Sequence, residues 1–166
     1  MHGDREGDQG SPATGGQSII ETLLAHPDPV SRKDAAIALG EIHDYSAIVA
    51  LARALHDPIK DVRGAVATSL ASKGPLAIGA LTEALADGNW MVRYRAAEVL
   101  GSIRDERSIT ALIHALEDGR DHVRYMAAKG LGKLGDRRAI GPLSAALADE
   151  NEFVRRAVKG ALESLG

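Results

Sequence analysis

The sequence of 166 residues contains no cysteine and only five aromatic residues: one Trp, three Tyr and one Phe. The lack of cysteine excludes disulfide bonds and thiolate metal sites. β-Strands favour aromatic and β-branched side chains, whereas this chain takes its apolar residues mostly from Ala and Leu. The composition therefore favours closely packed helices over a sheet.

A strong positive charge and long apolar runs are also missing. The formal net charge is -3, whereas nucleic-acid-binding domains are usually basic. No apolar run approaches the ~20 residues that a membrane-spanning helix needs. The N-terminal stretch MHGDREGDQG lacks the apolar core of a secretory signal. We therefore expect a cytoplasmic protein without membrane contact, and the charge argues against nucleic acid as its partner.

Internal repetition is the most prominent feature of the sequence. A Val-Arg pair followed by small residues and a leucine recurs as VRGAVATSLA, VRYRAAEVLG, VRYMAAKGLG and VRRAVKGALE, with a weaker copy SRKDAAIALG. The arginines are separated by 31, 30, 31 and 31 residues, and a leucine ahead of each follows the same spacing. The arginine and the leucine recur together five times at the same spacing, which indicates five structural repeats. The arginines are Arg32, Arg63, Arg93, Arg124 and Arg155.

Each repeat contains two stretches whose apolar residues recur at the spacing of one helix face. We predict first helices at 17–25, 46–55, 76–85, 106–116 and 137–147, and second helices at 31–42, 60–72, 90–103, 121–134 and 152–165. A two-helix unit cannot bury its apolar face alone, so neighbouring repeats must stack. The sequence therefore predicts an all-α fold, an α-solenoid of about five two-helix repeats of about 31 residues.

The ends and one link depart from this regular pattern. Residues 1–15 show no apolar periodicity, and we predict that they form a disordered tail, which leaves residues 16–166 as a single repeat domain. Asp105 and Asp136 are expected to cap the first helices that follow them. The link at Gly74 and Pro75 is one residue shorter than its counterparts, so we expect a local change of curvature there.

The pattern Asp-x5-Arg-x2-Ala-Ala-x2-Leu-Gly resembles the short HEAT-like repeats of the phycobilisome lyase type, over roughly residues 17–166. The resemblance implies a right-handed superhelix whose second helices line a concave surface. It also implies a ladder of Asp and Arg side chains, six residues apart in each repeat, that holds the repeats in register. The expected ladder residues are Asp57, Arg63, Asp87, Arg93, Asp118, Arg124, Asp149 and Arg155.

Some proteins with similar repeats are enzymes, but this sequence carries no catalytic motif. The His-Glu dipeptides through which the similar deoxyhypusine hydroxylases bind iron are absent. His114, Asp118 and His122 surround one link, yet their spacing matches no strong metal motif, and the scattered glycines form no phosphate loop. We therefore predict a non-catalytic protein without a metal or a cofactor.

Three of the five aromatic residues gather in two neighbouring repeats. Tyr94 and Tyr125 occupy equivalent positions 31 residues apart, and Trp90 precedes Tyr94 by one turn. Clustered Tyr and Trp are typical of binding surfaces, although Trp90 could instead pack on the neighbouring link. We predict a protein-interaction scaffold that binds its partner on the concave face through Trp90, Tyr94, Arg95, Glu98, Tyr125, Met126, Lys129 and Lys133.

The charges expected on the inner face suggest the kind of partner. Five basic residues there outnumber three acidic ones, so a protein with an acidic and partly apolar segment fits best. Two alternatives remain: an enzyme-associated subunit of the lyase type that holds a cofactor or a modified protein in the same groove, and a nucleic-acid binder. The basic residues are Lys33, Arg95, Lys129, Lys133 and Arg156, and the acidic ones are Asp34, Glu41 and Glu98.

Overall fold

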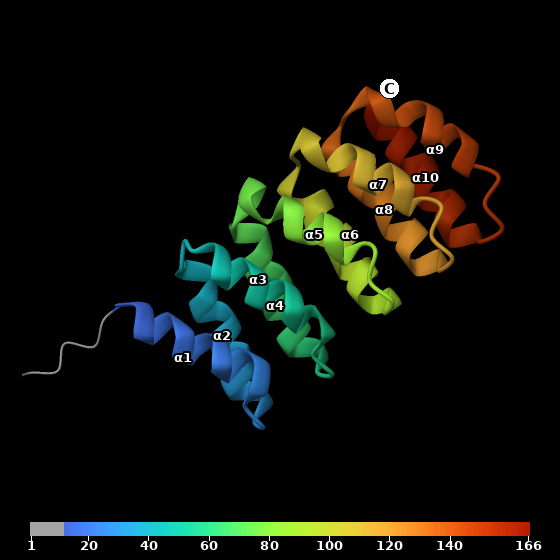
Figure 1. Cartoon of the computed structure of the whole chain (residues 1–166). Coiled ribbons are helices and arrows are strands. Elements are labelled where there is room, and N and C mark those ends of the chain that lie inside the picture. The colour runs from blue at the N-terminus through green and yellow to red at the C-terminus, as the bar shows by residue number, and fades with distance from the viewer. Residues whose placement is uncertain (1–11) are drawn as a thin grey trace, which may run out of the picture.

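A computed structural model describes residues 12–166, which form five consecutive helix pairs (Figure 1). The all-α solenoid predicted from the sequence is confirmed. No helix in this part of the chain has both the length and the apolar character needed to cross a membrane. The first helices of the pairs are α1 (Pro12–Ala25), α3 (Tyr45–Arg53), α5 (Ile78–Ala84), α7 (Ile109–Ala115) and α9 (Ile140–Ala146). The second helices are α2 (Pro29–Glu41), α4 (Lys60–Ser72), α6 (Trp90–Ile103), α8 (Asp121–Leu134) and α10 (Glu152–Leu165).

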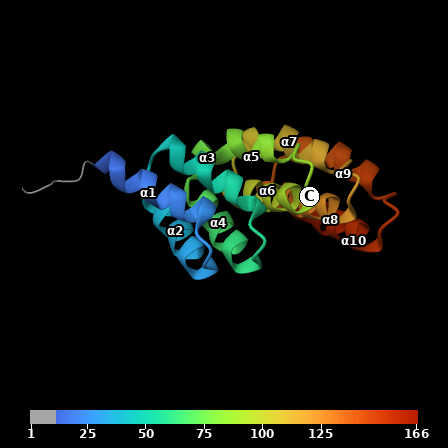
Figure 2. The same cartoon turned by 60° about the horizontal axis from the view of Figure 1, so that its bottom comes forward.

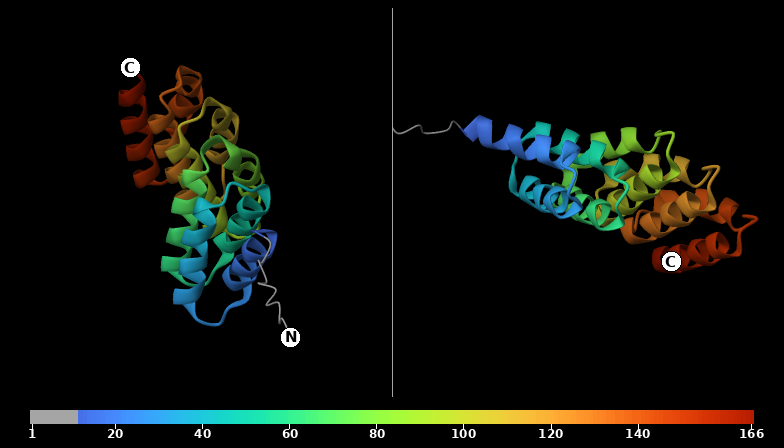
Figure 3. Two further views of the ribbon diagram at one scale, coloured as in Figure 1. Left: turned by 90° about the vertical axis from the view of Figure 1, so that its left-hand side faces the viewer. Right: turned by 90° about the horizontal axis from the view of Figure 1, so that it is seen from below.

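First and second helices lie in two separate layers, and α1 and α10 are at opposite ends of the stack (Figures 2 and 3). Neighbouring second helices pack closely against one another, whereas neighbouring first helices make fewer contacts. A stack that is tighter in one layer curves toward that layer. The second helices therefore form the inner layer of the solenoid, and the first helices form the outer layer.

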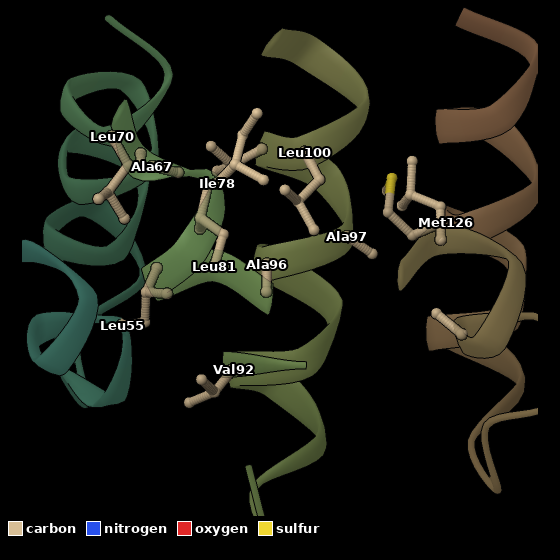
Figure 4. Packing of buried hydrophobic residues seen from close by; sticks show 14 of the residues in the cluster. Leu55, Ala67, Leu70, Ile78, Leu81, Val92, Ala96, Ala97, Leu100 and Met126 are labelled. Atoms are coloured by element: carbon tan, nitrogen blue, oxygen red, sulfur yellow. The ribbon is translucent and has the colours of Figure 1, made fainter. Parts of the chain in front are cut away.

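The hydrophobic core runs between the two layers along the whole stack. Figure 4 shows part of it, where Leu81 of α5 lies between Leu55 of the preceding repeat and Leu100 of α6. A valine and a leucine that lie eight residues apart, and so share a helix face, anchor this core in α4, α6, α8 and α10, whereas α2 has Ser31 at the valine position. The fully buried members of the two columns are Val62, Val92, Val123, Val154, Leu39, Leu70, Leu100 and Leu131.

The helix ends follow the capping pattern of the sequence. Asp105 and Asp136 accept backbone N–H groups of Arg107 and Arg138, at the start of the 3-10 turns that open two first helices. These short turns are η1 (Ala54–His56), η2 (Gly74–Ala77), η3 (Glu106–Ser108) and η4 (Arg137–Ala139). η1 follows α3, and the other three lead directly into first helices.

The predicted disordered tail needs one correction. Residues 1–11 lie outside the part that the structure describes, but residues 12–15 belong to α1. Proline is well suited to the first turn of a helix, because its fixed φ matches the helix and its missing N–H needs no partner there. The helix therefore begins at Pro12, ahead of the apolar periodicity that starts near Ile19.

The short third repeat begins without a capping aspartate. Its link runs directly from Gly74, in a left-handed conformation with φ of 54°, into Pro75. The aspartate that caps the other links has no counterpart between these two residues. Its loss shortens this repeat to 30 residues. The change of curvature expected there stays a prediction.

Glycines set how closely the second helices approach each other. Gly101 of α6 faces Gly130 of α8, and a Cβ added to Gly101 would lie 2.5 Å from the Gly130 Cα. At the junction of α4 and α6 the equivalent residues are Ala71 and Val99, which both carry side chains. Accordingly, α4 and α6 make fewer contacts than the other neighbouring second helices. Other pairs in close approach are Gly40 with Ser69 and Gly132 with Ala161.

Candidate functional site

At three of the four junctions between repeats, an arginine side chain ties one repeat to the next along one edge of the inner layer. The Arg93 guanidinium donates to the two carboxylate oxygens of Asp118, 25 residues later, at 2.6 and 2.8 Å. Its Nη1 also donates to the carbonyl oxygen of Asp87, in its own link, at 2.9 Å. One fork thus joins a link to the link of the following repeat. The pairs that share this carboxylate contact are Arg32 with Asp57 and Arg124 with Asp149.

The ladder differs from the predicted one in its direction. The carboxylates of Asp57, Asp118 and Asp149 accept hydrogen bonds from the arginine of the preceding repeat. Only the backbone carbonyl of each accepts from the arginine six residues later. Arg32 was missed as a ladder residue because the expected partner in its own repeat is His26. The constant spacing of 25 residues between arginine and carboxylate would have identified it.

One rung of the ladder is replaced at the short repeat. Arg63 and Asp87 are only 24 residues apart, and Arg63 donates to the carbonyl oxygens of Asp57 and Pro58. Within residues 12–166, no carboxylate accepts from Arg63, and the Asp87 carboxylate instead pairs with His56 Nε2 at 2.8 Å. Arg155, in the last repeat, likewise bonds only carbonyl oxygens of its own link.

The ladder carboxylates are ionised and fully engaged. Burial alone would raise the pKa of Asp118, but hydrogen bonds from the Arg93 side chain and the Arg120 backbone hold this pKa below its ordinary value. The hydrogen bond from Arg124 is the largest effect on Asp149 and lowers its pKa despite burial. Carboxylates held in this way serve the scaffold, because neither a proton nor a metal ion can easily displace the guanidinium.

At the α7–α8 link His122 Nδ1 pairs with the Asp121 carboxylate at 2.7 Å, but the predicted set of His114, Asp118 and His122 does not form a metal site. Asp118 is bound to Arg93, and the His122 ring faces Trp90, with the two ring centres 5.2 Å apart. Across residues 12–166, no three His, Asp or Glu side chains come together in a way that could hold a metal ion.

The residues of the predicted aromatic patch are not all exposed. Trp90 is half-buried and links the start of α6 to the start of α8 through His122. Met126 is buried, and Figure 4 shows it reaching from α8 toward Ala97 of α6. The prediction that Met126 faces a partner is therefore wrong. The small side chain of Ala97 leaves room between the helices, which the flexible methionine fills.

Tyr94 and Tyr125 occupy matching positions on α6 and α8, each half-buried and each beneath a cation. The Arg95 guanidinium lies 5.6 Å from the centre of the Tyr94 ring, and the Lys129 ammonium lies 5.4 Å from that of Tyr125. Burial, followed by the nearby Glu98 carboxylate, raises the pKa of the Tyr94 phenol. Arg95 also donates to Glu98 at 2.6 Å, so the charges around Tyr94 are balanced.

Two grooves cross the inner layer. The N-terminal groove, of about 620 Å³, lies over α2 and α4 and is bounded by Arg95 of α6. Its floor is made by small side chains of α4, and its charged residues include both signs, as with Lys60 and Asp61.

The C-terminal groove, of about 630 Å³, lies between α8 and α10 and has a different character. All charged side chains that line it are cations, and no described carboxylate lines it. Two aromatic rings, Tyr125 and Phe153, stand beside the cations. The cations that line it are Arg104, Lys129, Lys133 and Arg156.

The two grooves divide the residues predicted to bind a partner. Arg95 lines the N-terminal groove, whereas Tyr125, Lys129 and Lys133 line the C-terminal one. Trp90, Tyr94, Glu98 and Met126 line neither. Sequence reasoning did not assign Arg104 and Phe153 to the site. The repeat alignment offered a signal for Phe153, which follows the column of Met91 and His122 at the start of the second helices.

The sequence and the fold both have known counterparts. The profile of HEAT repeats matches residues 17–80 and 78–163. No curated protein sequence matches the chain. Among solved structures, the chain is similar to human deoxyhypusine hydroxylase in complex with glycerol, at 20% identity over 92% of this chain and 74% of that chain, with a TM-score of 0.57.

Two further structures show the same architecture. One is the complex of CpcE and CpcF of phycocyanin lyase from Nostoc sp., at 24% identity over 99% of this chain and 70% of that chain, with a TM-score of 0.64. The other is a designed armadillo repeat protein in complex with the peptide (KR)4, at 18% identity over 93% of this chain and 83% of that chain, with a TM-score of 0.54. At these identities the likeness is one of fold.

Proposed function

Because this chain belongs to the HEAT repeat family, we propose that it is a non-catalytic scaffold that holds a protein partner on its inner layer of second helices. The observation that carries the proposal is the repeated pair of an aromatic ring beneath a cation, Tyr94 with Arg95 and Tyr125 with Lys129. Both rings are fixed by packing against the core, so little side-chain entropy is lost when a partner binds.

The partner that suits this surface best has an acidic and partly apolar segment. Tyrosine and arginine are the side chains most often found at the energetic centre of protein interfaces. Lys129 and Lys133 add positive charge on the same helix, which favours association with carboxylates. The designed armadillo protein with its bound (KR)4 peptide is a precedent for peptide binding by this architecture.

The proposal can be tested by site-specific photo-crosslinking. A benzoylphenylalanine placed at Tyr94 or Tyr125 should crosslink to the partner, whereas the same group at Tyr45 should not. Tyr45 is the matched control because it is 68% exposed on α3, in the outer layer. Equal crosslinking from Tyr45 and from the inner positions would contradict binding on the inner layer.

A second candidate is a lyase-type subunit that holds a cofactor or a modified protein in the same surface. Its support is the similarity to the CpcE and CpcF complex, which extends over 99% of this chain. Absorption spectra of the protein purified from its native source distinguish the two functions. A stoichiometric visible chromophore would favour the lyase-type subunit, and its absence together with a crosslinked protein would favour the scaffold.

A further inference from the structure

Positive charge is concentrated at one end of this acidic chain. Residues 121–166 contain eight Lys and Arg against six Asp and Glu, a net of +2. Residues 1–120 contain 12 Lys and Arg against 17 Asp and Glu, a net of -5. The C-terminal groove lies within or beside the positive part, because α8 and α10 form its walls.

Three of the four cations of this groove have no carboxylate partner among the described residues, whereas several other arginines of the chain do. Arg95, Arg107 and Arg138 each pair with an acidic residue close in sequence. In residues 12–166, no carboxylate lies within ion-pair distance of Arg104, Lys129 or Lys133. The fourth cation, Arg156, donates to Glu152 at 2.9 Å, and both side chains are largely exposed. An anionic ligand could therefore bind these groups without breaking a buried ion pair.

Arg104 is held in an unfavourable backbone conformation at this place. It ends α6 with φ of 55° and ψ of 35°, the left-handed region, where the equivalent residues of the neighbouring repeats are Gly74 and Gly135. A side chain at such a position costs stability that glycine avoids. Its side chain lines the C-terminal groove. Because Arg104 adopts this strained left-handed backbone conformation and its side chain lines the groove, we infer that the side chain has a role beyond folding.

The groove also offers apolar surface. Small residues of both helices line it, Gly132 of α8 and Ala157 and Gly160 of α10, and Gly160 has open space where a Cβ would lie. Phe153 and Tyr125 line both this groove and a second hollow of about 340 Å³, whose other lining residues are Asp121, His122 and Asn151. Phe153 is 63% exposed, which is uncommon for a phenylalanine with no covering element.

We propose that the C-terminal groove binds a short acidic segment of a protein, in which Asp or Glu residues flank an apolar side chain. The carboxylates bind Arg104, Lys129 and Lys133, and the apolar side chain packs on Phe153. This inference rests on the proposed scaffold function and assigns the partner segment to one of the two grooves.

A protein segment fits this groove better than a nucleic acid does. Asp121 and Glu152 lie in the first turns of α8 and α10, next to the groove. A continuous phosphate backbone that extends along the helices would meet these carboxylates, whereas a peptide presents its charges at a few chosen positions. The overall charge of -3 adds a general repulsion of long polyanions.

The test is a titration of the full chain, labelled with ¹⁵N, with a synthetic peptide in which glutamates flank a phenylalanine. The amide signals of Gly132 and Gly160 should shift, and that of Gly64, in the N-terminal groove, should not. The same peptide with glutamine in place of glutamate should bind at least ~10-fold more weakly, because it lacks the charge that the cations attract.

Variants separate binding from folding. Lys129→Gln with Lys133→Gln should weaken peptide binding by ~10-fold or more, whereas Lys159→Gln, on an exposed part of α10 outside the groove, should leave it unchanged. Arg104→Gly should raise the melting temperature by about 2–4 °C, because glycine relieves the left-handed strain, and should still weaken peptide binding. Opposite effects on stability and binding cannot come from a purely structural role.

The outcomes that overturn the inference are equally specific. They are an absence of shifts at Gly132 and Gly160, an unchanged affinity in the Lys129→Gln/Lys133→Gln variant, or tighter binding of a single-stranded oligonucleotide than of the peptide. If any of these occurs while crosslinks from Tyr94 persist, the scaffold function stands and only the assignment to this groove fails. Loss of specific crosslinks from the inner layer would instead remove the scaffold function itself.

Discussion

Arg93 of one repeat and Asp118 of the next are joined by two hydrogen bonds of 2.6 and 2.8 Å, with both side chains more than four-fifths buried. Arg63, at the matching position one repeat earlier, makes the same backbone contacts but bonds no carboxylate among the described residues. Substitutions at Arg93 and Arg63 can therefore be compared to measure how much the hydrogen bonds between arginine and a carboxylate stabilise the fold.

Replacing Arg93 with methionine should lower the free energy of unfolding by about 2–4 kcal/mol, because Asp118 would remain partly buried without its partner. Arg63→Met loses only hydrogen bonds to carbonyl oxygens and should cost about 1 kcal/mol. Urea denaturation of the two variants measures the difference. Equal losses would mean that the backbone contacts, and not the carboxylate pair, hold the repeats together.

The ladder also predicts how stability depends on pH. Burial raises the pKa of Asp57 and Asp118, but hydrogen bonds from arginine and from the backbone, together with the nearby positive charges, keep this pKa below the ordinary value of 3.8. A carboxyl group whose pKa is lowered in the folded state stabilises the fold at pH values above its unfolded pKa, and this contribution disappears as the pH falls through the folded pKa. We therefore expect the free energy of unfolding to fall steeply below about pH 4.

Asp118→Asn isolates the contribution of one rung to this pH dependence. The variant should be less stable than the unmodified protein at pH 7, and the gap between them should narrow as the pH approaches 3. Denaturation curves of both proteins across this range give the gap directly. A gap that stays constant would show that the charge of Asp118 contributes nothing.

The repeat spacing predicted the helices well because it reflects packing that every repeat must satisfy. The predicted bounds of α4, α6, α8 and α10 match the structure, since the Val and Leu columns and the polar links recur in each. Helix bounds and packing positions that recur in every repeat can be predicted from a single sequence, because the same pattern is seen in several repeats.

Features that depend on the contact between two repeats were harder to predict. Met126 lies one helix position beyond Tyr125 and reads as a surface residue, yet the space beside Ala97 on the neighbouring helix buries it. For the same reason, the sequence predicted only some of the residues that line the C-terminal groove. Arg104 enters it from the end of α6, and no periodicity within one helix indicates that placement.

The close approach of α6 and α8 gives a prediction in which similar substitutions have opposite signs. Gly101→Ala places a Cβ 2.5 Å from the Gly130 Cα, so the helices must separate, and we expect a loss of about 1–3 kcal/mol. Gly64→Ala, inside α4 with open space around it, should gain about 0.5–1 kcal/mol from helix propensity. Thermal and urea unfolding of both variants measure the signs, and a stabilised Gly101→Ala would contradict the helix spacing.

Lys73 is buried where the other repeats carry isoleucine or leucine. Its Nζ donates to the carbonyl oxygens of Gly40 and Ile42 at 2.6 Å each, so it caps the C-terminal end of α2 from the next repeat. Burial lowers the pKa of this ammonium, and the Glu41 carboxylate opposes the shift. A cation at a helix C-terminus is favourable both for hydrogen bonding and for the helix dipole.

Lys73→Met keeps the aliphatic bulk and removes these two hydrogen bonds, so we expect a loss of about 1–2 kcal/mol in the free energy of unfolding. Lys159→Met, at an exposed position of α10, should change it by less than about 0.5 kcal/mol. Amide hydrogen exchange should locate the effect, with faster exchange at the end of α2 and little change in α8. A Lys73→Met variant as stable as the unmodified protein would mean that the cost of burying the ammonium cancels the cap, and that Lys73 adds no stability to the junction of the first two repeats.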